Sequence, residues 1–191
     1  MKSTLILNAT VVNEGEQKER DVFIMNGKIE RIDRNLQHIS ANTVIDASNL
    51  HLMPGMIDDQ VHFREPGLTH KADIGTESAA AVAGGTTSFM EMPNVSPPTT
   101  DSAALKKKFE IARRKSHANF SFYLGATNDN LDEILSVDTN LCCGIKVFMG
   151  ASTGNLLVDN VKSLEKIFNL APIHIATHCE DNQTITQNLS E

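Results

Sequence analysis

The stretch PGMIDDQVHFREPG (residues 54–67) decides how the rest of the chain is interpreted. It predicts a strand over residues 56–63 that ends at a Pro-Gly turn. Because side chains alternate along a strand, three polar residues at its end are expected to point to one side: Gln60, His62 and Arg64. An imidazole and a guanidinium at the end of a strand are unfavourable for packing alone. They are well suited to holding a metal ion and an anionic substrate.

The same stretch resembles the first barrel strand of dihydroorotases and related amidohydrolases. In that family the pattern Asp-x-His-x-His-x-Arg is followed by an acidic residue, Pro and Gly. Residues 58–67 match it except that Gln60 stands where the family has the first histidine of a metal-binding pair. The resemblance implies the N-terminal part of a dihydroorotase-like enzyme of the amidohydrolase superfamily.

The composition suits a globular protein and excludes some classes of function. The chain has 191 residues, of which 40% are apolar, and its net charge of −7 gives a pI near 5.5. A nucleic-acid-binding protein usually presents a basic face, so this balance argues against nucleic acid as a partner. The basic runs at residues 106–108 and 113–115 lie in one helical pattern and are interpreted as its solvated face.

The sequence also argues against a membrane partner, because no stretch approaches the ~20 apolar residues of a spanning helix. The three cysteines are Cys142, Cys143 and Cys179. An odd count with two adjacent members is typical of a protein in the reducing cytosol, so we expect a cytoplasmic location. Cys179 directly follows His178, and the alternation along a strand predicts that it packs in the core rather than binding metal.

Residues 1–53 predict a small, incomplete β-sandwich-like unit. The pair Asn26-Gly27 is a strong hairpin signal between strand patterns at residues 22–25 and 28–32. From position 54 onward strands alternate with helices, which predicts a parallel sheet with right-handed crossovers. The five expected strands are residues 56–63, 87–92, 119–124, 144–149 and 172–178.

Five βα units in residues 54–191 predict the first part of a (β/α)8 TIM-type barrel, since a complete barrel needs about 250 residues. An open α/β sheet is the alternative, but it would carry a Gly-rich phosphate loop after its first strand, and this sequence has none. The family resemblance favours the truncated barrel. We therefore expect the 191-residue chain to be part of a longer enzyme, inactive by itself and with open strand edges.

Lys146 is the most informative single residue of the expected site. It lies between Ile145 and Val147 in a strand covered on both faces, where a cation is costly to bury. Either the strand lies near a rim and the amine reaches water, or burial lowers the pKa of the amine so that it reacts with CO₂. The setting resembles the carboxylated lysine of dihydroorotases, hydantoinases and dihydropyrimidinases, which implies a CO₂-derived carbamate on Lys146.

The resemblance also implies a metal site made of His62, Lys146 and His178, although a lone strand histidine is more commonly a core residue. Arg64 and Asn94 resemble the family's substrate-binding pair. A guanidinium suits a carboxylate, and an amide can donate to and accept from the edge of a cyclic amide. The alternatives are a surface salt bridge for Arg64 and a turn position before a Pro-rich loop for Asn94.

The resemblance implies zinc-dependent hydrolysis of a cyclic amide, in which zinc lowers the pKa of a water molecule and polarises the carbonyl group. In the reverse direction the reaction closes N-carbamoyl-L-aspartate to L-dihydroorotate in pyrimidine biosynthesis. The family's catalytic aspartate would come from a strand beyond residue 191. Gln60 is a poorer ligand than histidine, which predicts one well-occupied zinc and a partly filled or empty second position.

Three interpretations of the function remain open at this point. The first is a dihydroorotase, the second an allantoinase or dihydropyrimidinase-type hydrolase, and the third a non-catalytic dihydroorotase-like subunit kept for assembly. Arg64 and residues 92–98 favour the first, because a carboxylate substrate needs a cation to bind it. Gln60 and the short barrel favour the third, although such a subunit has no need to keep the five site residues. The expected ligand is a small molecule, and the sequence leaves a homo-oligomer open.

Overall fold

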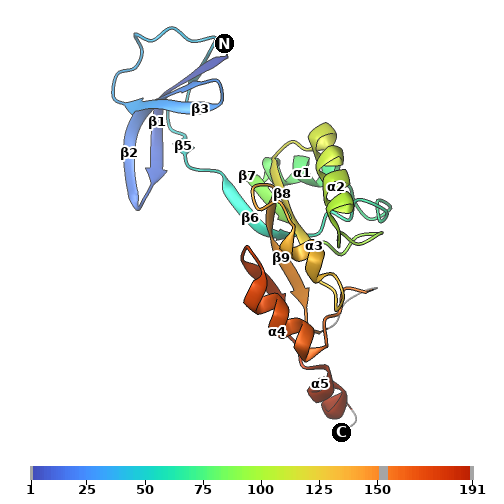
Figure 1. Ribbon diagram of the computed structural model, residues 1–191. Coiled ribbons are helices and arrows are strands. Elements are labelled where there is room, and N and C mark those ends of the chain that lie inside the picture. The colour runs from blue at the N-terminus through green and yellow to red at the C-terminus, as the bar shows by residue number, and fades with distance from the viewer. Residues whose placement is uncertain (1, 151–154, 190–191) are drawn as a thin grey trace. The chain divides into compact units, whose positions relative to one another are not determined.

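The computed structural model describes residues 2–150 and 155–189 of the chain (Figure 1). The chain divides into two compact units, Met1–Gly55 and Met56–Glu191. Each unit has its own sheet and its own buried apolar residues.

The first unit is a mixed sheet in the order β3-β2-β1-β4, with β5 also paired to β1. Its strands are β1 (Ser3–Asn13), β2 (Glu16–Met25), β3 (Lys28–Asp33), β4 (Thr43–Asp46) and β5 (His51–Leu52). The predicted hairpin joins β2 to β3, and both of its turn residues have positive φ, 52° at Asn26 and 79° at Gly27. This is the backbone that a tight hairpin turn requires. A β-sandwich consists of two packed sheets, and the described residues of this unit form one sheet.

The second unit is a parallel sheet of five strands. These are β6 (Met56–Val61), β7 (Thr86–Glu91), β8 (Asn119–Gly125), β9 (Cys142–Phe148) and β10 (Ile175–His178). Each strand pairs with its neighbours in the chain, in the order β10-β9-β8-β7-β6. A doubly wound sheet reverses its strand order at a switch point, whereas a barrel does not. The predicted truncated (β/α)8 barrel is therefore confirmed, and the open-sheet alternative is wrong.

A helix follows each of these strands, and α1 and α2 start at side-chain caps that the sequence supplies. They are α1 (Ile74–Ala83), α2 (Ser102–Lys115), α3 (Leu131–Leu135), α4 (Val161–Leu170) and α5 (Asn182–Leu189). Asp73 accepts a hydrogen bond from the backbone N–H of Thr76 at the start of α1, and Asp101 caps α2 in the same way. Such caps satisfy N–H groups that have no partner within the helix.

The core of the second unit lies between the sheet and helices α1 to α4. Phenylalanine rings fill its centre, with Phe63 and Phe89 at 4.6 Å between centroids and Phe109 and Phe122 at 5.0 Å. Strand positions alternate between this core and the other face of the sheet. A predicted site residue on one of these strands therefore points either into this core or to the other face of the sheet.

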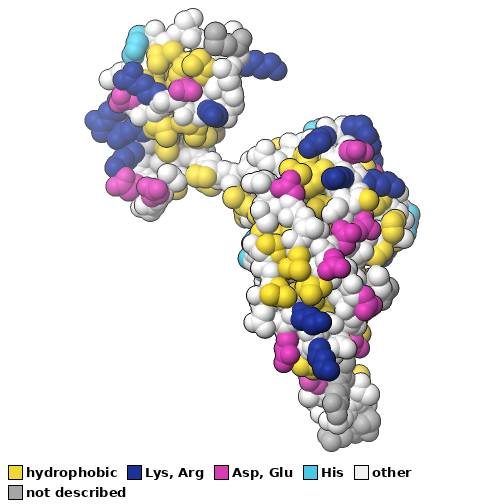
Figure 2. All heavy atoms as spheres, in the orientation of Figure 1, with side chains coloured by type: hydrophobic (Ala, Val, Ile, Leu, Met, Phe, Trp, Pro, Cys, Tyr) yellow, Lys and Arg dark blue, Asp and Glu magenta, His cyan; other side chains and the backbone are white. Residues whose placement is uncertain are grey.

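Basic side chains gather over α2, as Figure 2 shows, and most of them are exposed as predicted. Lys108 is the exception, because its side chain is fully buried. The prediction that residues 106–108 all lie on the solvated face is therefore wrong for Lys108. Its place in the pattern explains this: together with Leu105, Phe109 and Ala112 it forms one helical stripe at i, i+3, i+4 and i+7.

Two strands are shorter than predicted. Strand β6 ends at Val61 instead of residue 63, and β10 begins at Ile175 instead of residue 172. Pro172 has no backbone N–H to donate to a neighbouring strand, which disfavours strand pairing at that position. Within residues 2–150 and 155–189, no helix has the length and apolar character needed to cross a membrane.

Candidate metal and substrate site

The end of β6 turns the motif residues in different directions. Phe63 is buried against Phe89, while His62 is half-buried outside this aromatic contact. Arg64 has a φ of 71°, in the left-handed region, so the strand alternation does not extend to it. The sequence argument that Gln60, His62 and Arg64 share one side by strand parity is therefore wrong for Arg64. Its backbone is fixed by a hydrogen bond instead, since Arg64 N–H donates to Glu91 Oε1 at 3.0 Å.

His62 contacts Asn94 directly. The distance between His62 Nδ1 and Asn94 Oδ1 is 2.9 Å. With the amide oxygen as acceptor, Nδ1 carries the proton and Nε2 keeps a free lone pair. The imidazole is thereby left in the form in which Nε2 can bind a metal ion.

The loop that carries Asn94 is held against the motif by backbone hydrogen bonds. Met92 N–H donates to Val61 O at 3.0 Å, and Ser96 N–H donates to Pro66 O at 3.1 Å. Gly67, with a φ of 83°, makes this approach possible, because a Cβ there would lie 1.9 Å from Ser96 O. Any larger residue would force the two loops apart.

Burial is the main reason why the pKa of His62 lies below its ordinary value, and the charge of Arg64 lowers it further. The hydrogen bond to Asn94 acts in the opposite direction, and the charge of Lys146 adds a smaller lowering. Both Arg64 and Lys146 therefore act electrostatically on His62. Neutral imidazole, the form that binds metal, is favoured as a result.

Lys146 is only 3% exposed and lies on the face of β9 opposite the core residues Ile145 and Val147. Its partners in the neighbouring strands are two small residues, Gly125 and Ala176. Burial lowers the pKa of the Lys146 amine, and the negative charge of a Cys179 thiolate would raise it. The alternative in which the amine reaches water at a rim does not fit this burial.

His178 is the last residue of β10 and pairs in register with Phe148 of β9. Lys146 pairs with Ala176 in the same ladder, so Lys146 and His178 share one face of the sheet. Both contact Phe148: Lys146 Nζ is 4.9 Å from the centre of its ring, and the His178 ring is at 6.1 Å. His178 Nε2 also lies 3.3 Å from Glu180 Oε1.

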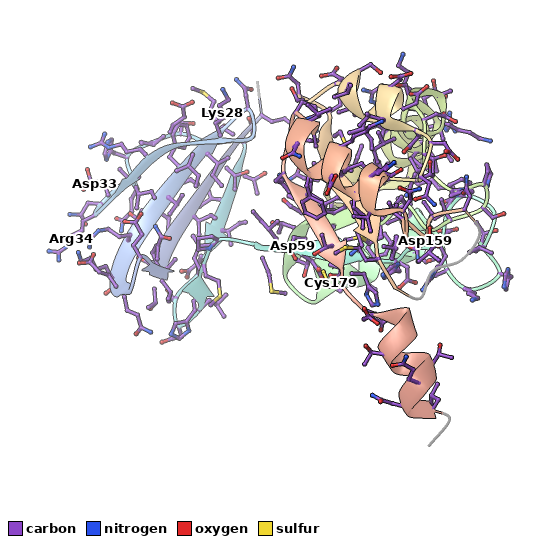
Figure 3. The ribbon with its side chains drawn as sticks, turned by 60° about the horizontal axis from the view of Figure 1, so that its bottom comes forward. Lys28, Asp33, Arg34, Asp59, Asp159 and Cys179 are labelled. Atoms are coloured by element: carbon purple, nitrogen blue, oxygen red, sulfur yellow. The ribbon has the colours of Figure 1, made fainter. Side chains whose placement is uncertain are left out.

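Cys179 (labelled in Figure 3) is exposed, so the prediction that it packs in the core is wrong. Strand β10 ends at His178, and the alternation on which the prediction depended does not continue past it. Gln60 is also exposed, and its backbone N–H donates to Asp58 Oδ1 at 3.1 Å.

The structure thus brings His62 and Asn94 into contact and places Arg64 and Lys146 within electrostatic reach of His62. His178 shares a face of the sheet with Lys146, and both contact Phe148. Within the described ranges, no three His, Cys, Asp or Glu side chains are gathered as a metal-binding group. The donor set nevertheless fits a metal once Lys146 carries a carboxylate, because two imidazoles and an anionic oxygen ligand suit zinc.

Glu91 and Lys108 are functional candidates that sequence reasoning missed. They form a buried ion pair beneath the loops of Arg64 and Asn94, with Lys108 Nζ 2.9 Å from Glu91 Oε2. Burial raises the pKa of Glu91 and lowers that of Lys108, and each charge opposes the shift of the other. The position of Lys108 within the apolar stripe of α2 was the signal that could have revealed it.

Comparisons with known proteins give a consistent result. No family model matches the sequence. A dihydroorotase from Methanosarcina acetivorans is 34% identical over 176 residues, which cover 88% of this chain and 38% of that protein. An allantoinase from Salmonella choleraesuis is 33% identical over 198 aligned residues, which cover 98% of this chain and 43% of that protein.

Among solved structures, the L-hydantoinase (dihydropyrimidinase) from Arthrobacter aurescens superimposes with a TM-score of 0.87 at 28% sequence identity. The match covers 100% of this chain and 44% of the hydantoinase chain. The chain therefore spans about two fifths of the length of the relatives that it matches.

Proposed function

This chain belongs to the cyclic amidohydrolase family, and on that premise we propose that it forms the metal- and substrate-binding part of a dihydroorotase. The proposed reaction is the interconversion of N-carbamoyl-L-aspartate and L-dihydroorotate, a step of pyrimidine biosynthesis in the cytoplasm. The burial of Lys146 is the observation that carries the proposal.

Carboxylation is the proposed role of Lys146. The neutral amine attacks the carbon of CO₂, an N–C bond forms, one C=O π bond becomes an anionic oxygen, and Nζ loses a proton to solvent. Burial favours the neutral amine that this step needs. A carbamate converts a poor metal ligand into an anionic one with two oxygens.

His62, His178 and the modified Lys146 are the residues proposed to hold zinc. Zinc, when bound, lowers the pKa of a water molecule and polarises the amide carbonyl that is attacked. The contact with Asn94 orients His62 for this role by leaving Nε2 free. Gln60 is the reason to expect one well-occupied zinc rather than two, because a neutral amide oxygen is a weaker ligand than imidazole.

Arg64 is the proposed receptor for the substrate carboxylate, and Asn94 contributes its amide nitrogen. Dihydroorotate carries a carboxylate, whereas allantoin and hydantoin do not. A guanidinium beside the metal site therefore favours dihydroorotate over the substrates of the allantoinase and hydantoinase relatives.

The test compares dihydroorotate with allantoin and hydantoin. Binding of each compound, in the presence of zinc and bicarbonate, is measured by calorimetry on the chain, and turnover is measured on a longer protein that contains it. Preference for dihydroorotate supports the proposal. Preference for allantoin or hydantoin supports an allantoinase or dihydropyrimidinase-type activity instead. Zinc binding without affinity for any of the three compounds supports a non-catalytic subunit instead.

A further inference from the structure

The ion pair between Glu91 and Lys108 has a feature that core packing does not explain. Both side chains are almost completely buried, with exposed fractions of 0% for Glu91 and 1% for Lys108. Burying two opposite charges rarely stabilises a fold more than an apolar pair of similar volume does. The reason for an ion pair at this position is therefore sought in the other groups that its two side chains contact.

The remaining contacts of the pair lead to two loops. Glu91 Oε1 accepts the backbone N–H of Arg64 at 3.0 Å, and Lys108 Nζ donates to the backbone oxygen of Met92 at 3.1 Å. Lys108 Nζ also lies 2.9 Å from Glu91 Oε2, so the opposite charges attract each other directly. One carboxylate thus fixes the loop of Arg64, and one ammonium fixes the loop that leads to Asn94.

Each fixed loop has a conformation that needs support. Arg64 has a φ of 71°, which non-glycine residues adopt only when the surroundings stabilise it. Asn94 follows Met92 by two residues and must reach His62 Nδ1. A charged hydrogen bond to the backbone is stronger and more directional than an apolar contact, and therefore limits how far each loop can move.

We propose that Glu91 and Lys108 are a positioning pair that sets the distance between Arg64 and Asn94, and thereby the recognition of a substrate carboxylate. This inference depends on the proposed function for the identity of the substrate. It makes the two residues positioning residues and not catalytic residues, because neither contacts the proposed metal or substrate.

The first experiment removes both charges together in the variant Glu91→Leu/Lys108→Met, so that neither charge is left buried without its partner. The control is Lys107→Met, the same substitution at the exposed neighbouring lysine. Amide hydrogen exchange is followed at two sites. One is Ser96, whose N–H donates to Pro66 O between the loops, and the other is Ile145 of β9, whose N–H donates to His174 O next to β10. The double variant changes neither hydrogen bond directly.

For a positioning pair, exchange at Ser96 accelerates about tenfold in the double variant while exchange at Ile145 and in the control stays unchanged. Equal acceleration at Ser96 and Ile145 means that the pair acts only on global stability, and no acceleration means that it does not hold the loops. Either result overturns the inference. If the double variant does not fold, Glu91→Gln/Lys108→Met replaces it, because glutamine keeps an acceptor for Arg64 N–H and the release of Met92 alone still accelerates exchange at Ser96.

The second experiment compares binding of dihydroorotate with binding of dihydrouracil, the same ring without the carboxylate. Loss of positioning weakens dihydroorotate by about tenfold and dihydrouracil by less than about twofold, since only the former depends on Arg64. Equal weakening of both ligands contradicts a specific effect on the carboxylate. If the unaltered protein binds neither ligand, the proposed function fails, while hydrogen exchange at Ser96 still decides the positioning role.

Discussion

Asn94 Oδ1 lies 2.9 Å from His62 Nδ1, so a residue of the loop after β7 orients a ring at the end of β6. The ends of two neighbouring strands therefore supply a histidine and the amide group that fixes its tautomer. The contact suggests that Asn94 acts on the metal through His62 as well as on the substrate.

The variant Asn94→Leu is expected to bind zinc about 10–100-fold more weakly, because His62 loses the acceptor that keeps Nε2 free. A competition titration with a chromophoric chelator measures this, with Asn169→Leu on the exposed surface of α4 as the control. Unchanged zinc affinity together with weaker dihydroorotate binding would mean that Asn94 acts on the substrate and not on the metal.

Lys146→Met is expected to remove a CO₂ adduct that the unaltered protein carries in bicarbonate buffer. The physical reason is that CO₂ reacts with the neutral form of an amine, which burial favours at Lys146. Native mass spectrometry detects the adduct, and Lys166→Met at an exposed lysine of α4 is the matched control. An unaltered protein without any adduct, at saturating bicarbonate and zinc, contradicts the role given to Lys146.

Gln60→His is expected to raise the zinc content from about one to about two per chain, because imidazole replaces an amide as a ligand. Metal analysis after gel filtration gives the count, and Gln37→His in the first unit controls for zinc bound by an added surface histidine. Two tightly held zinc ions in the unaltered protein would show that Gln60 does not limit metal binding.

Asp73→Ala is expected to lower the free energy of unfolding by about 0.5–2 kcal/mol at neutral pH, because the cap of α1 is lost. The hydrogen bond from Thr76 N–H and the charge of Lys115 keep the pKa of Asp73 below its usual value in the folded protein. The stabilisation is therefore complete above the ordinary aspartate pKa and decreases as the pH falls through the folded value.

Urea unfolding of the unaltered protein and of Asp73→Ala, at neutral pH and at about pH 3, tests this prediction. The difference between the two proteins should shrink in acid. Asp73→Asn is the control, since asparagine keeps a capping oxygen but does not titrate in this range. A difference that stays constant with pH would mean that the ionised carboxylate contributes nothing beyond the hydrogen bond.

Much of the second unit could be predicted from local patterns. Asp101 marks the start of α2 and Gly84-Gly85 the end of α1, because caps and glycines act within a few residues of themselves. The strand alternation correctly placed Lys146 opposite Ile145 and Val147, since the pairing of β9 is regular around Lys146 and its one irregularity lies before Gly144.

The failures lie where strands end and where distant residues meet. Arg64 and Cys179 follow the last residues of their strands, so parity no longer determines where their side chains point. The helical stripe of α2 could have indicated that Lys108 is buried, but its partner Glu91 lies 17 positions earlier on another element, and local periodicity cannot identify it. The roles of the five predicted site residues remain predictions for the experiments above.

The close approach of Gly67 to Ser96 has a consequence for how this protein can change over evolutionary time. The carbonyl oxygen of Ser96 occupies the space that a Cβ atom at position 67 would need. A substitution of Gly67 would therefore displace the loop that contains Ser96. Neither loop is free to drift in sequence on its own. New ligand preferences in such a scaffold would have to arise by paired substitutions, or at positions outside this junction.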